Sequence, residues 1–327
     1  MMVVLNILLL AAGFVGLVKG ADLFVDGSAS LARQFRIPGL IIGLTIVALG
    51  TSAPELAVSV SAALQGSNEI ALSNVVGSNL FNLLCVLGAC SIVYPVPVDR
   101  EVLRRDFPVS IGSTVFVLLI ACGAAIVSGN FFSLELSAPA GIVTRAAGLI
   151  LLIGFIIYIV YLVYNARKNP SETVEGPENH SIAKCILLIL IGLVLIVAGG
   201  QAVVYSAKEI ARAAGMTETL IGLTIVALGT SLPELVTSIV AAKKGETEMA
   251  LGNVIGSCIF NLMMILGLSS FIHPIGVNAA SVYDLSILII VSFLVMCFAA
   301  TSRQITRKEG IILLVIYFAD MAYAIIR

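Results

Sequence analysis

Long apolar runs separated by short polar segments dominate the chain. Ten of these runs are long enough to cross a bilayer, which takes about 20 residues of α-helix. Uninterrupted runs such as residues 146–163 do not alternate between apolar and polar positions, so the pattern favours helices over a membrane β-barrel. We therefore predict an all-α integral membrane protein with ten transmembrane helices. The expected spans are 3–24, 38–64, 69–94, 107–128, 138–164, 183–206, 217–243, 247–272, 284–302 and 309–326.

The composition narrows the class of protein further. Apolar residues make up 59% of the chain and charged residues only 11%, so its surroundings are expected to be membrane lipid. A net charge of −1 without a basic patch excludes nucleic acid as a partner. The six cysteines lie in apolar stretches without metal-ligand spacing, and the two histidines are isolated. We therefore expect no cofactor, and an enzyme is the least favoured class.

Basic residues in the loops predict the orientation in the membrane. With the N-terminus outside, the inner side holds thirteen of them, namely Arg33, Arg36, Arg100, Arg104, Arg105, Arg167, Lys168, Lys184, Lys243, Lys244, Arg303, Arg307 and Lys308. The outer side keeps Lys208, Arg212 and Arg327. We expect a multi-pass protein of the cytoplasmic (inner) membrane with both termini outside. The first span lacks the basic start of a signal peptide and is expected to be a retained helix.

The chain contains an internal duplication. Residues 42–88 align without a gap with residues 221–267 at an offset of 179, and 30 of the 47 positions are identical. We expect two five-helix repeats, at 1–164 and 183–327, joined by a polar cytoplasmic linker at 165–182. Because five is odd, the second repeat enters the membrane from the opposite side. This is the inverted-repeat plan of secondary transporters.

The duplicated segment carries a motif that should break its helix. It reads GLTIVALGTSAPELAVS at residues 43–59 and GLTIVALGTSLPELVTS at residues 222–238. Pro54 and Pro233 lack an N–H, so the second and seventh helices are expected to be broken there. Irregular backbone at membrane depth is tolerated where it is buried or lines a cavity, and carbonyl oxygens suit Na⁺ or Ca²⁺. The break therefore predicts a cation site.

Glu55 and Glu234 are the central candidates, because a lone carboxylate at the bilayer centre costs roughly 3 kcal/mol on insertion scales. Hydroxyl and amide residues recur at helical spacing around both glutamates and on the helix that follows each. These residues are Thr51, Ser52, Ser59, Asn74, Ser78 and Asn82 in the first repeat and Thr230, Ser231, Ser238, Asn253, Ser257 and Asn261 in the second. Together they would form a cage of oxygen donors, which excludes zinc or copper as cargo.

Other residues near the motif are explained by helix packing or by hydration. Gly77, Gly88, Gly256 and Gly267 are expected to allow close helix packing. Asp22, Asp26 and Asp320 lie near span ends, where hydration explains them, and we do not expect them to be ligands. Two carboxylates carry a charge of −2, which one Ca²⁺ or two Na⁺ would balance. If the cage closes only when it is balanced, exchange becomes obligatory.

At these motifs the sequence resembles the calcium/cation antiporter superfamily, and within it the prokaryotic sodium/calcium exchangers of the YrbG-like branch. The resemblance implies antiport of Na⁺ and Ca²⁺ by alternating access, with several Na⁺ per Ca²⁺ and helices one and six sliding against the others. The implied ligands are Ala48 (carbonyl), Thr51, Ser52, Glu55, Ser78, Asn82, Ala227 (carbonyl), Thr230, Ser231, Glu234, Ser257 and Asn261. A monomer is expected to be functional.

Two positions depart from the pattern of the family. Some relatives have an aspartate where Asn261 stands, and its absence implies that K⁺ is not co-transported. Cys258 occupies the position that Asn79 occupies in the first repeat, and we expect it to face away from the ions.

Two alternative functions stay open. In a cation/proton antiporter the two glutamates would release ions by protonation, although the amides of Asn82 and Asn261 carry no titrating proton. A cation channel could use a similar cage as a filter, but filters are usually formed by subunits around an axis. The sequence fixes neither the ion stoichiometry nor the divalent cation.

Overall fold

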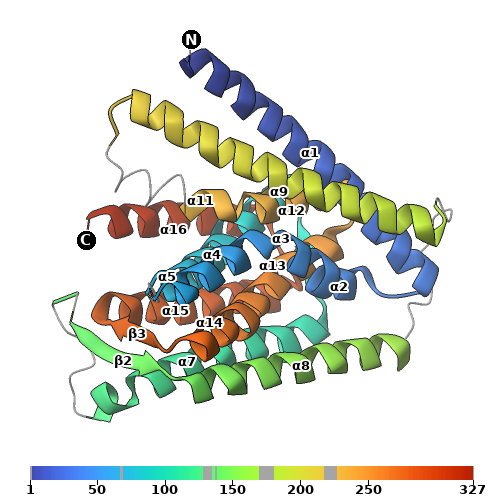
Figure 1. The fold of residues 1–327 in the computed structure, drawn as a ribbon. Coiled ribbons are helices and arrows are strands. Elements are labelled where there is room, and N and C mark those ends of the chain that lie inside the picture. Colours follow the sequence, from blue (N-terminus) through green and yellow to red (C-terminus); the bar gives the residue numbers. More distant parts are fainter. Residues whose placement is uncertain are drawn as a thin grey trace.

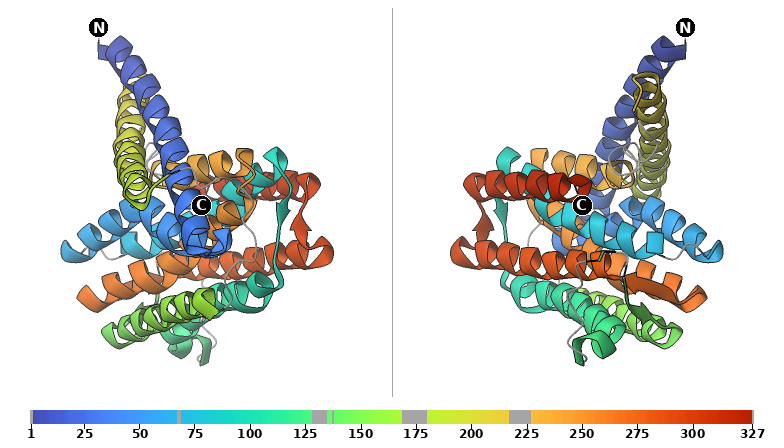
Figure 2. Two further views of the ribbon diagram at one scale, coloured as in Figure 1. Left: turned by 90° about the vertical axis from the view of Figure 1, so that its right-hand side faces the viewer. Right: turned by 90° about the vertical axis from the view of Figure 1, so that its left-hand side faces the viewer.

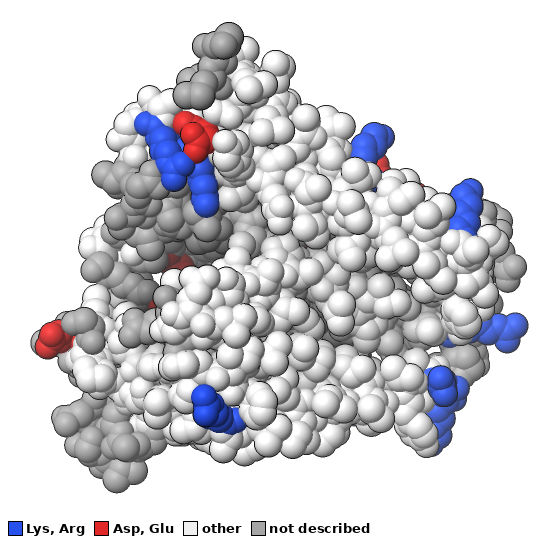
Figure 3. Space-filling view, in the orientation of Figure 1, with Lys and Arg blue, Asp and Glu red and all other residues white. Residues whose placement is uncertain are grey.

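The computed structural model describes residues 2–66, 69–127, 135–136, 138–168, 180–216 and 227–326. Within these ranges the chain is mainly helical, and the helices pack into one bundle (Figure 1). Seven described helices are long and apolar enough to cross a membrane, and a bent helix pair brings the number to eight. The broad middle of the face in Figure 3 carries almost no charge, as a lipid-facing surface requires.

Two long helices form a pair on one side of the bundle. They are α1 (Met2–Phe35) and α9 (Ile182–Ala213), which run side by side (Figures 1 and 2). Glycines on each helix face the backbone of the other. A Cβ on Gly20 would lie 2.8 Å from the carbonyl oxygen of Gly192, and a Cβ on Gly199 would lie 2.7 Å from that of Gly13. The two backbones can approach this closely only because these positions have no side chain.

The first motif forms a broken helix. It comprises α2 (Gly39–Ile42), the π-helical turn η1 (Gly43–Val47), α3 (Ala48–Thr51) and α4 (Ala53–Leu64). The axis bends by 51° between α3 and α4. The second motif forms α11 (Ala227–Thr230) and α12 (Leu232–Lys243). Residues 217–226, where the seventh predicted span begins, lie outside the described residues.

The helices that follow each motif lie at the centre of the bundle. In the first half they are α5 (Glu69–Leu80), η2 (Phe81–Val86) and α6 (Leu87–Val93). In the second half they are α13 (Thr247–Ile259), η5 (Phe260–Ile265) and α14 (Leu266–Ile272). Both of these spans are 78% buried over their apolar windows, against 22% for α1 and α9. The polar residues of the motif therefore sit in the core and not against lipid.

The remaining helices surround this core. They are α7 (Phe107–Val127), which follows the π-helical turn η3 (Val102–Asp106), α8 (Arg145–Lys168), α15 (Ala279–Ser302) and α16 (Arg307–Ile326). Short antiparallel strands tie the helix ends together. β1 (Val96–Pro97) pairs with β4 (Gln304–Ile305), and β2 (Pro139–Val143) pairs with β3 (Ile275–Asn278).

The observed helices differ from the predicted spans at several ends. α1 runs eleven residues beyond the predicted end at residue 24, and α9 runs seven beyond residue 206. Both extensions contain polar and charged residues, so a search for uninterrupted apolar runs ends before them. Residues 139–143 were expected to be helical and instead form β2, because their backbone pairs with β3. α8 continues to Lys168, inside the linker predicted to start at residue 165, and residues 169–179 lie outside the described part.

Candidate cation-binding site

The two motifs meet at the centre of the protein through reciprocal hydrogen bonds. Ser52 of the first motif donates to Oε1 of Glu234 over 2.8 Å. Ser231 of the second motif donates to Oε1 of Glu55 over 2.9 Å. All four side chains have 0% of their surface exposed. Each carboxylate is therefore held by the opposite half of the chain.

The next helices close the same cluster from two further sides. The hydroxyl of Ser52 lies 3.0 Å from that of Ser257, and the hydroxyl of Ser231 lies 3.1 Å from that of Ser78. A serine has a single O–H, so a serine that donates to a carboxylate can only accept from its other neighbour. Four helical segments thus contribute to one connected polar cluster, and we call it the cage.

The breaks in the two motif helices determine the directions of these side chains. Ser52 has φ −83° and ψ 10°, and Ser231 has φ −93° and ψ 6°, which are not helical values. Pro54 and Pro233 then occupy the first turn of the helix that follows, where a missing N–H costs nothing. The break thus falls two residues before each proline, and the serine at the break points across to the other motif.

Several buried polar atoms of the cage have no hydrogen-bond partner among the described residues. An unpaired buried polar atom costs about 1–3 kcal/mol, and more when it is charged. The atoms are Oε2 of Glu55, Oε2 of Glu234, both amide atoms of Asn82, Oδ1 of Asn261 and Oγ1 of Thr230. Oxygen atoms at the centre of a membrane protein that lack protein donors are suited to hold hard cations such as Na⁺ or Ca²⁺.

Thr51 and the carbonyl of Ala48, which are both predicted ligands, already have hydrogen-bond contacts within the protein. Thr51 lies 3.1 Å from the carbonyl oxygen of Val47 and 3.0 Å from Oδ1 of Asn253. The resemblance implied the carbonyl of Ala48 as a ligand. In the structure this carbonyl accepts the N–H of Ser52 over 3.0 Å, and the hydroxyl of Thr51 lies 3.4 Å from it. Ala227 is described only as the start of α11.

The other residues of the polar stripes pair with one another. Asn74 donates to Ser59 over 2.9 Å, and Asn253 donates to Ser238 over 2.9 Å. The same pair thus forms in both halves. These hydrogen bonds brace the helix after the break against the next helix.

One polar contact across the two halves was not expected from the sequence. Asn79, which no ligand list included, accepts a hydrogen bond from Asn261 over 3.0 Å and donates to the carbonyl of Cys258 over 3.1 Å. The thiol of Cys258 lies 3.9 Å from the carbonyl of Asn79. Nothing in the spacing of these residues signals the contact, because they lie on helices of different repeats.

Two of the acidic residues near span ends lie close to a lysine, and the third borders a cavity. Lys244 lies 2.7 Å from Asp26 and 3.4 Å from Asp22. Asp320 borders a cavity of about 150 Å³ that also reaches Asn74 and Ser78. That cavity brings one face of the cage close to α16.

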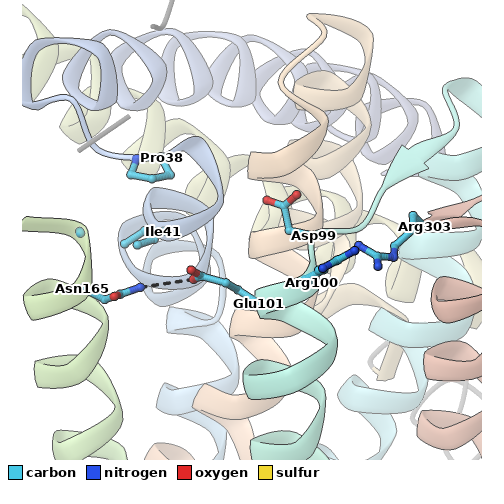
Figure 4. A pocket seen from close by; sticks show the side chains of 8 residues that line it. Pro38, Ile41, Asp99, Arg100, Glu101, Asn165 and Arg303 are labelled. Carbon is cyan, nitrogen blue, oxygen red and sulfur yellow. Dashed lines mark hydrogen bonds between the residues drawn. The ribbon is translucent and has the colours of Figure 1, made fainter. Parts of the chain in front are cut away.

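A separate hollow lies at the helix ends (Figure 4). It has a volume of about 370 Å³ and is lined by charges of both signs. Glu101 on its wall accepts a hydrogen bond from Asn165 over 3.3 Å and pairs with Arg105 over 2.9 Å. Figure 4 also shows the side chains of Arg100 and Arg303 next to each other. None of the predicted ligands lines this hollow, so it is not part of the cage.

Comparisons with known proteins agree over nearly the whole chain. The family described as sodium/calcium exchanger protein matches residues 5–164 and 184–326. The chain is 38% identical to the putative antiporter CaxA of Alkalimonas amylolytica, over 93% of this chain and 94% of that protein. It is 34% identical to the sodium/calcium exchanger MaX1 of Methanosarcina acetivorans, over 97% and 98%. A solved structure of the sodium-calcium exchanger NCX_Mj superposes with a TM-score of 0.82 at 32% identity, over 98% of this chain and 99% of that one.

Proposed function

Because the chain belongs to the sodium/calcium exchanger protein family, we propose that it exchanges Na⁺ for Ca²⁺ across the membrane through the cage. It is a multi-pass antiporter and not an enzyme, and it needs no cofactor. The ions are its substrates. The proposed ligands are the twelve residues that the resemblance to the family implied, with Glu55 and Glu234 at their centre.

The observation that carries this proposal is the pair of carboxylates. Each glutamate is completely buried and keeps one oxygen atom without a partner in the described part of the chain. A buried charge without a partner is strongly unfavourable, so cations must balance the two carboxylates. One Ca²⁺ or two Na⁺ would balance a charge of −2. The same atoms can therefore serve both ions, which compete for them.

The duplicated sequence supports an architecture of ten helices in two inverted repeats. The contacts within the cage recur at the offset of 179: Ser52 with Glu234 corresponds to Ser231 with Glu55, and Asn74 with Ser59 corresponds to Asn253 with Ser238. Such reciprocal pairs are expected from a two-fold axis through the cage. The broken helices would then be the second and the seventh.

We infer that movement of the α1–α9 pair provides alternating access. The pair lies on one side of the bundle, and the N-terminal end of α1 points away from the other helices (Figure 2). Movement of this pair would open the cage to one side of the membrane and then to the other. We place the protein in the cytoplasmic membrane as a monomer, with both termini outside, as its loop charges favour.

The competing function is cation/proton antiport, in which protons replace Na⁺. Asn82 and Asn261 count against it, since an amide cannot take up a proton at physiological pH. Purified protein in proteoliposomes separates the two functions. We expect an inward-directed or outward-directed Na⁺ gradient to drive ⁴⁵Ca²⁺ movement with the pH clamped on both sides. Ca²⁺ movement that requires a proton gradient and ignores Na⁺ would refute the proposal.

Net Ca²⁺ movement without a counter-ion is the second test of the same preparation. Because an unbalanced cage should not close, vesicles without Na⁺ or Ca²⁺ on the far side should show no uptake. Single-channel currents in a planar bilayer would instead establish a channel. Saturable uptake that depends on the counter-ion would exclude one.

A further inference from the structure

Asn79 joins the two halves of the cage at a point that the ion ligands do not explain. It lies on α5 with 0% of its surface exposed, and it contacts α13 and η5 of the other half. Its amide nitrogen donates to the backbone carbonyl of Cys258, and its amide oxygen accepts from Asn261. Both hydrogen bonds are buried, so water does not compete for them, and together they fix the orientation of the Asn79 amide.

These bonds determine which way the amide of Asn261 points. A backbone carbonyl can only accept, so the nitrogen of Asn79 must face Cys258 and its oxygen must face Asn261. Asn261 must then present its nitrogen to Asn79. The oxygen of Asn261 is left on the other side of the planar amide, where it has no partner within the described residues. A chain of two amides thus starts at a backbone carbonyl and ends on an oxygen atom that is available to an ion.

The first half lacks the same arrangement. At the offset of 179, Asn82 corresponds to Asn261 and Cys258 corresponds to Asn79. A thiol has no oxygen that can accept from an amide as Asn79 does. Asn82 is also 0% exposed, and neither of its amide atoms has a partner in the parts of the chain that are described. No hydrogen bond among the described residues therefore fixes the amide of Asn82, whereas Asn79 fixes that of Asn261.

We propose that Asn79 is a positioning residue that makes Asn261 a fixed oxygen ligand and thereby favours Ca²⁺ over Na⁺ in the cage. This inference rests on the proposed function. The interaction energy of an ion with an amide dipole is proportional to the charge of the ion. A misoriented amide therefore costs a divalent ion about twice as much binding free energy as a monovalent ion. Fixing the amide of Asn261 therefore contributes more to Ca²⁺ binding than to Na⁺ binding.

The decisive variant is Asn79→Cys, which copies the residue that the second half already has at this position. We expect it to raise the KM for Ca²⁺ by roughly 10- to 100-fold, the usual loss when the partner of a metal ligand is removed. The Na⁺ concentration for half-maximal exchange should rise only by about the square root of that factor. Ser292→Cys is the matched control, because Ser292 bonds within its own helix α15 and should change neither value.

The reverse variant, Cys258→Asn, tests the inference when Asn79→Cys does not fold. Its added amide nitrogen could donate to the carbonyl of Asn79, which the native thiol already faces, and its oxygen would then face Asn82. We expect a KM for Ca²⁺ at least about twofold lower, with a smaller change for Na⁺. The double variant should lie between the two single variants.

The measurement is Na⁺-driven ⁴⁵Ca²⁺ uptake into proteoliposomes at a series of Ca²⁺ and Na⁺ concentrations. A general structural defect would lower the maximal rate or change both ion dependences equally, and either result for Asn79→Cys would overturn the inference. An unchanged KM for Ca²⁺ in Cys258→Asn would overturn it as well. Wild-type exchange in the same vesicles tests the proposed function separately, so failure of the variants beside an active wild type removes only the role of Asn79.

Discussion

At the scale of single residues, the cage treats its two glutamates alike. Each accepts one serine hydroxyl from the opposite motif and keeps one oxygen atom without a partner among the described residues. Because these contacts match, they assign neither carboxylate a supporting role. Both should be required for the charge of −2 that one Ca²⁺ balances.

Glu55→Gln and Glu234→Gln should therefore each abolish exchange. The amide keeps the volume of the side chain but leaves a single negative charge for the ions, and we expect the rate to fall by about 100-fold or more. Na⁺-driven ⁴⁵Ca²⁺ uptake measures this. Glu101→Gln is the matched control, because Glu101 lies at the helix ends with its side chain 56% exposed and should leave uptake unchanged. Substantial exchange in either cage variant would contradict the proposed site.

The serines provide a test of equivalence between the repeats. Ser52→Ala and Ser231→Ala each remove one hydrogen bond to a carboxylate, worth about 1.5–3 kcal/mol when the acceptor is charged. We expect the KM for Ca²⁺ to rise by roughly tenfold or more in both variants, and by similar factors. Strongly unequal effects would show that the two motifs do not contribute equally.

The sequence indicated which residues gather in the cage better than which hydrogen bonds they form. Glu55 and Glu234 stood out because a carboxylate in an apolar run needs compensation, and their repetition linked them to one site. The reciprocal bonds from Ser231 and Ser52 could not be derived, since the serines share a helix face with their own glutamates and yet bond the opposite ones. The role of Asn79 was hidden for the same reason.

At the scale of helices, the packing of α1 against α9 depends on glycine. On α1, Gly13 and Gly20 are seven residues apart, and on α9, Gly192 and Gly199 have the same spacing. A Cβ on Gly192 would lie 2.7 Å from the carbonyl oxygen of Gly20, which is too close for real atoms. An alanine at any of these positions must push the two helices apart.

Gly20→Ala and Gly192→Ala should therefore destabilise the protein. Overpacking a close contact costs about 1–3 kcal/mol, which exceeds the gain of about 1 kcal/mol in helix propensity. The thermal midpoint of the detergent-purified protein should fall in both variants. Gly112→Ala is the matched control, because no described atom lies within 4 Å of a Cβ there, and its midpoint should stay level or rise. Equal behaviour of all three variants would show that the α1–α9 contact is not tightly packed.

The glycines of the duplicated segment mark a limit of the sequence interpretation at this scale. They were assigned to close packing, and that is confirmed for Gly88, Gly256 and Gly267, where a Cβ would lie 2.7–3.1 Å from the backbone of another helix. For Gly77 it stays a prediction, because the segment at 221–226 that corresponds to the neighbours of Gly256 lies outside the described residues. A glycine pattern alone does not say which helix, if any, faces it. The paired strands were missed for a related reason, because β1 and β4 are only two residues long and carry no periodic pattern.

At the scale of the whole molecule, ion pairs fasten the α1–α9 pair to the other helices at one end. Lys244 lies 2.7 Å from Asp26, and Arg33 lies 3.0 Å from Glu246, so the C-terminal half of α1 is tied to the turn between α12 and α13. Beneath them is a cavity of about 270 Å³ that is bordered by Ala29, Ala32 and Arg33. We call these ion pairs the latch.

The repeat lacks a second latch at the opposite end. At the offset of 179, Lys244 corresponds to Gln65, Asp26 to Tyr205 and Glu246 to Ser67, so neither ion pair of the latch has a counterpart there. Gln65 bonds Ser61 on its own helix instead. The charges thus break the symmetry that the repeats would otherwise give, and they stabilise the arrangement in which α1 is tied to the turn between α12 and α13.

Lys244→Gln, which copies the residue of the first repeat, should therefore open the latch end more often. Partly exposed ion pairs contribute about 0.2–1 kcal/mol each, so the open population should rise by a few-fold. Reaction of a maleimide with Ala29→Cys, in a background without the native cysteines, measures this, because Ala29 is only 4% exposed while the latch is closed.

The variant and salt should act on the same interaction. High salt weakens exposed ion pairs, so 1 M salt should speed labelling of the protein with the intact latch and have little effect on Lys244→Gln. Lys243→Gln is the matched control, since it removes the same charge one residue earlier, where no ion pair forms in the described structure. If both variants label at the same rate, charge near the turn and not the latch controls access. If Lys244→Gln labels no faster than the unaltered latch, the ion pairs do not hold this end closed, and the preference for one orientation of the α1–α9 pair must come from its packing.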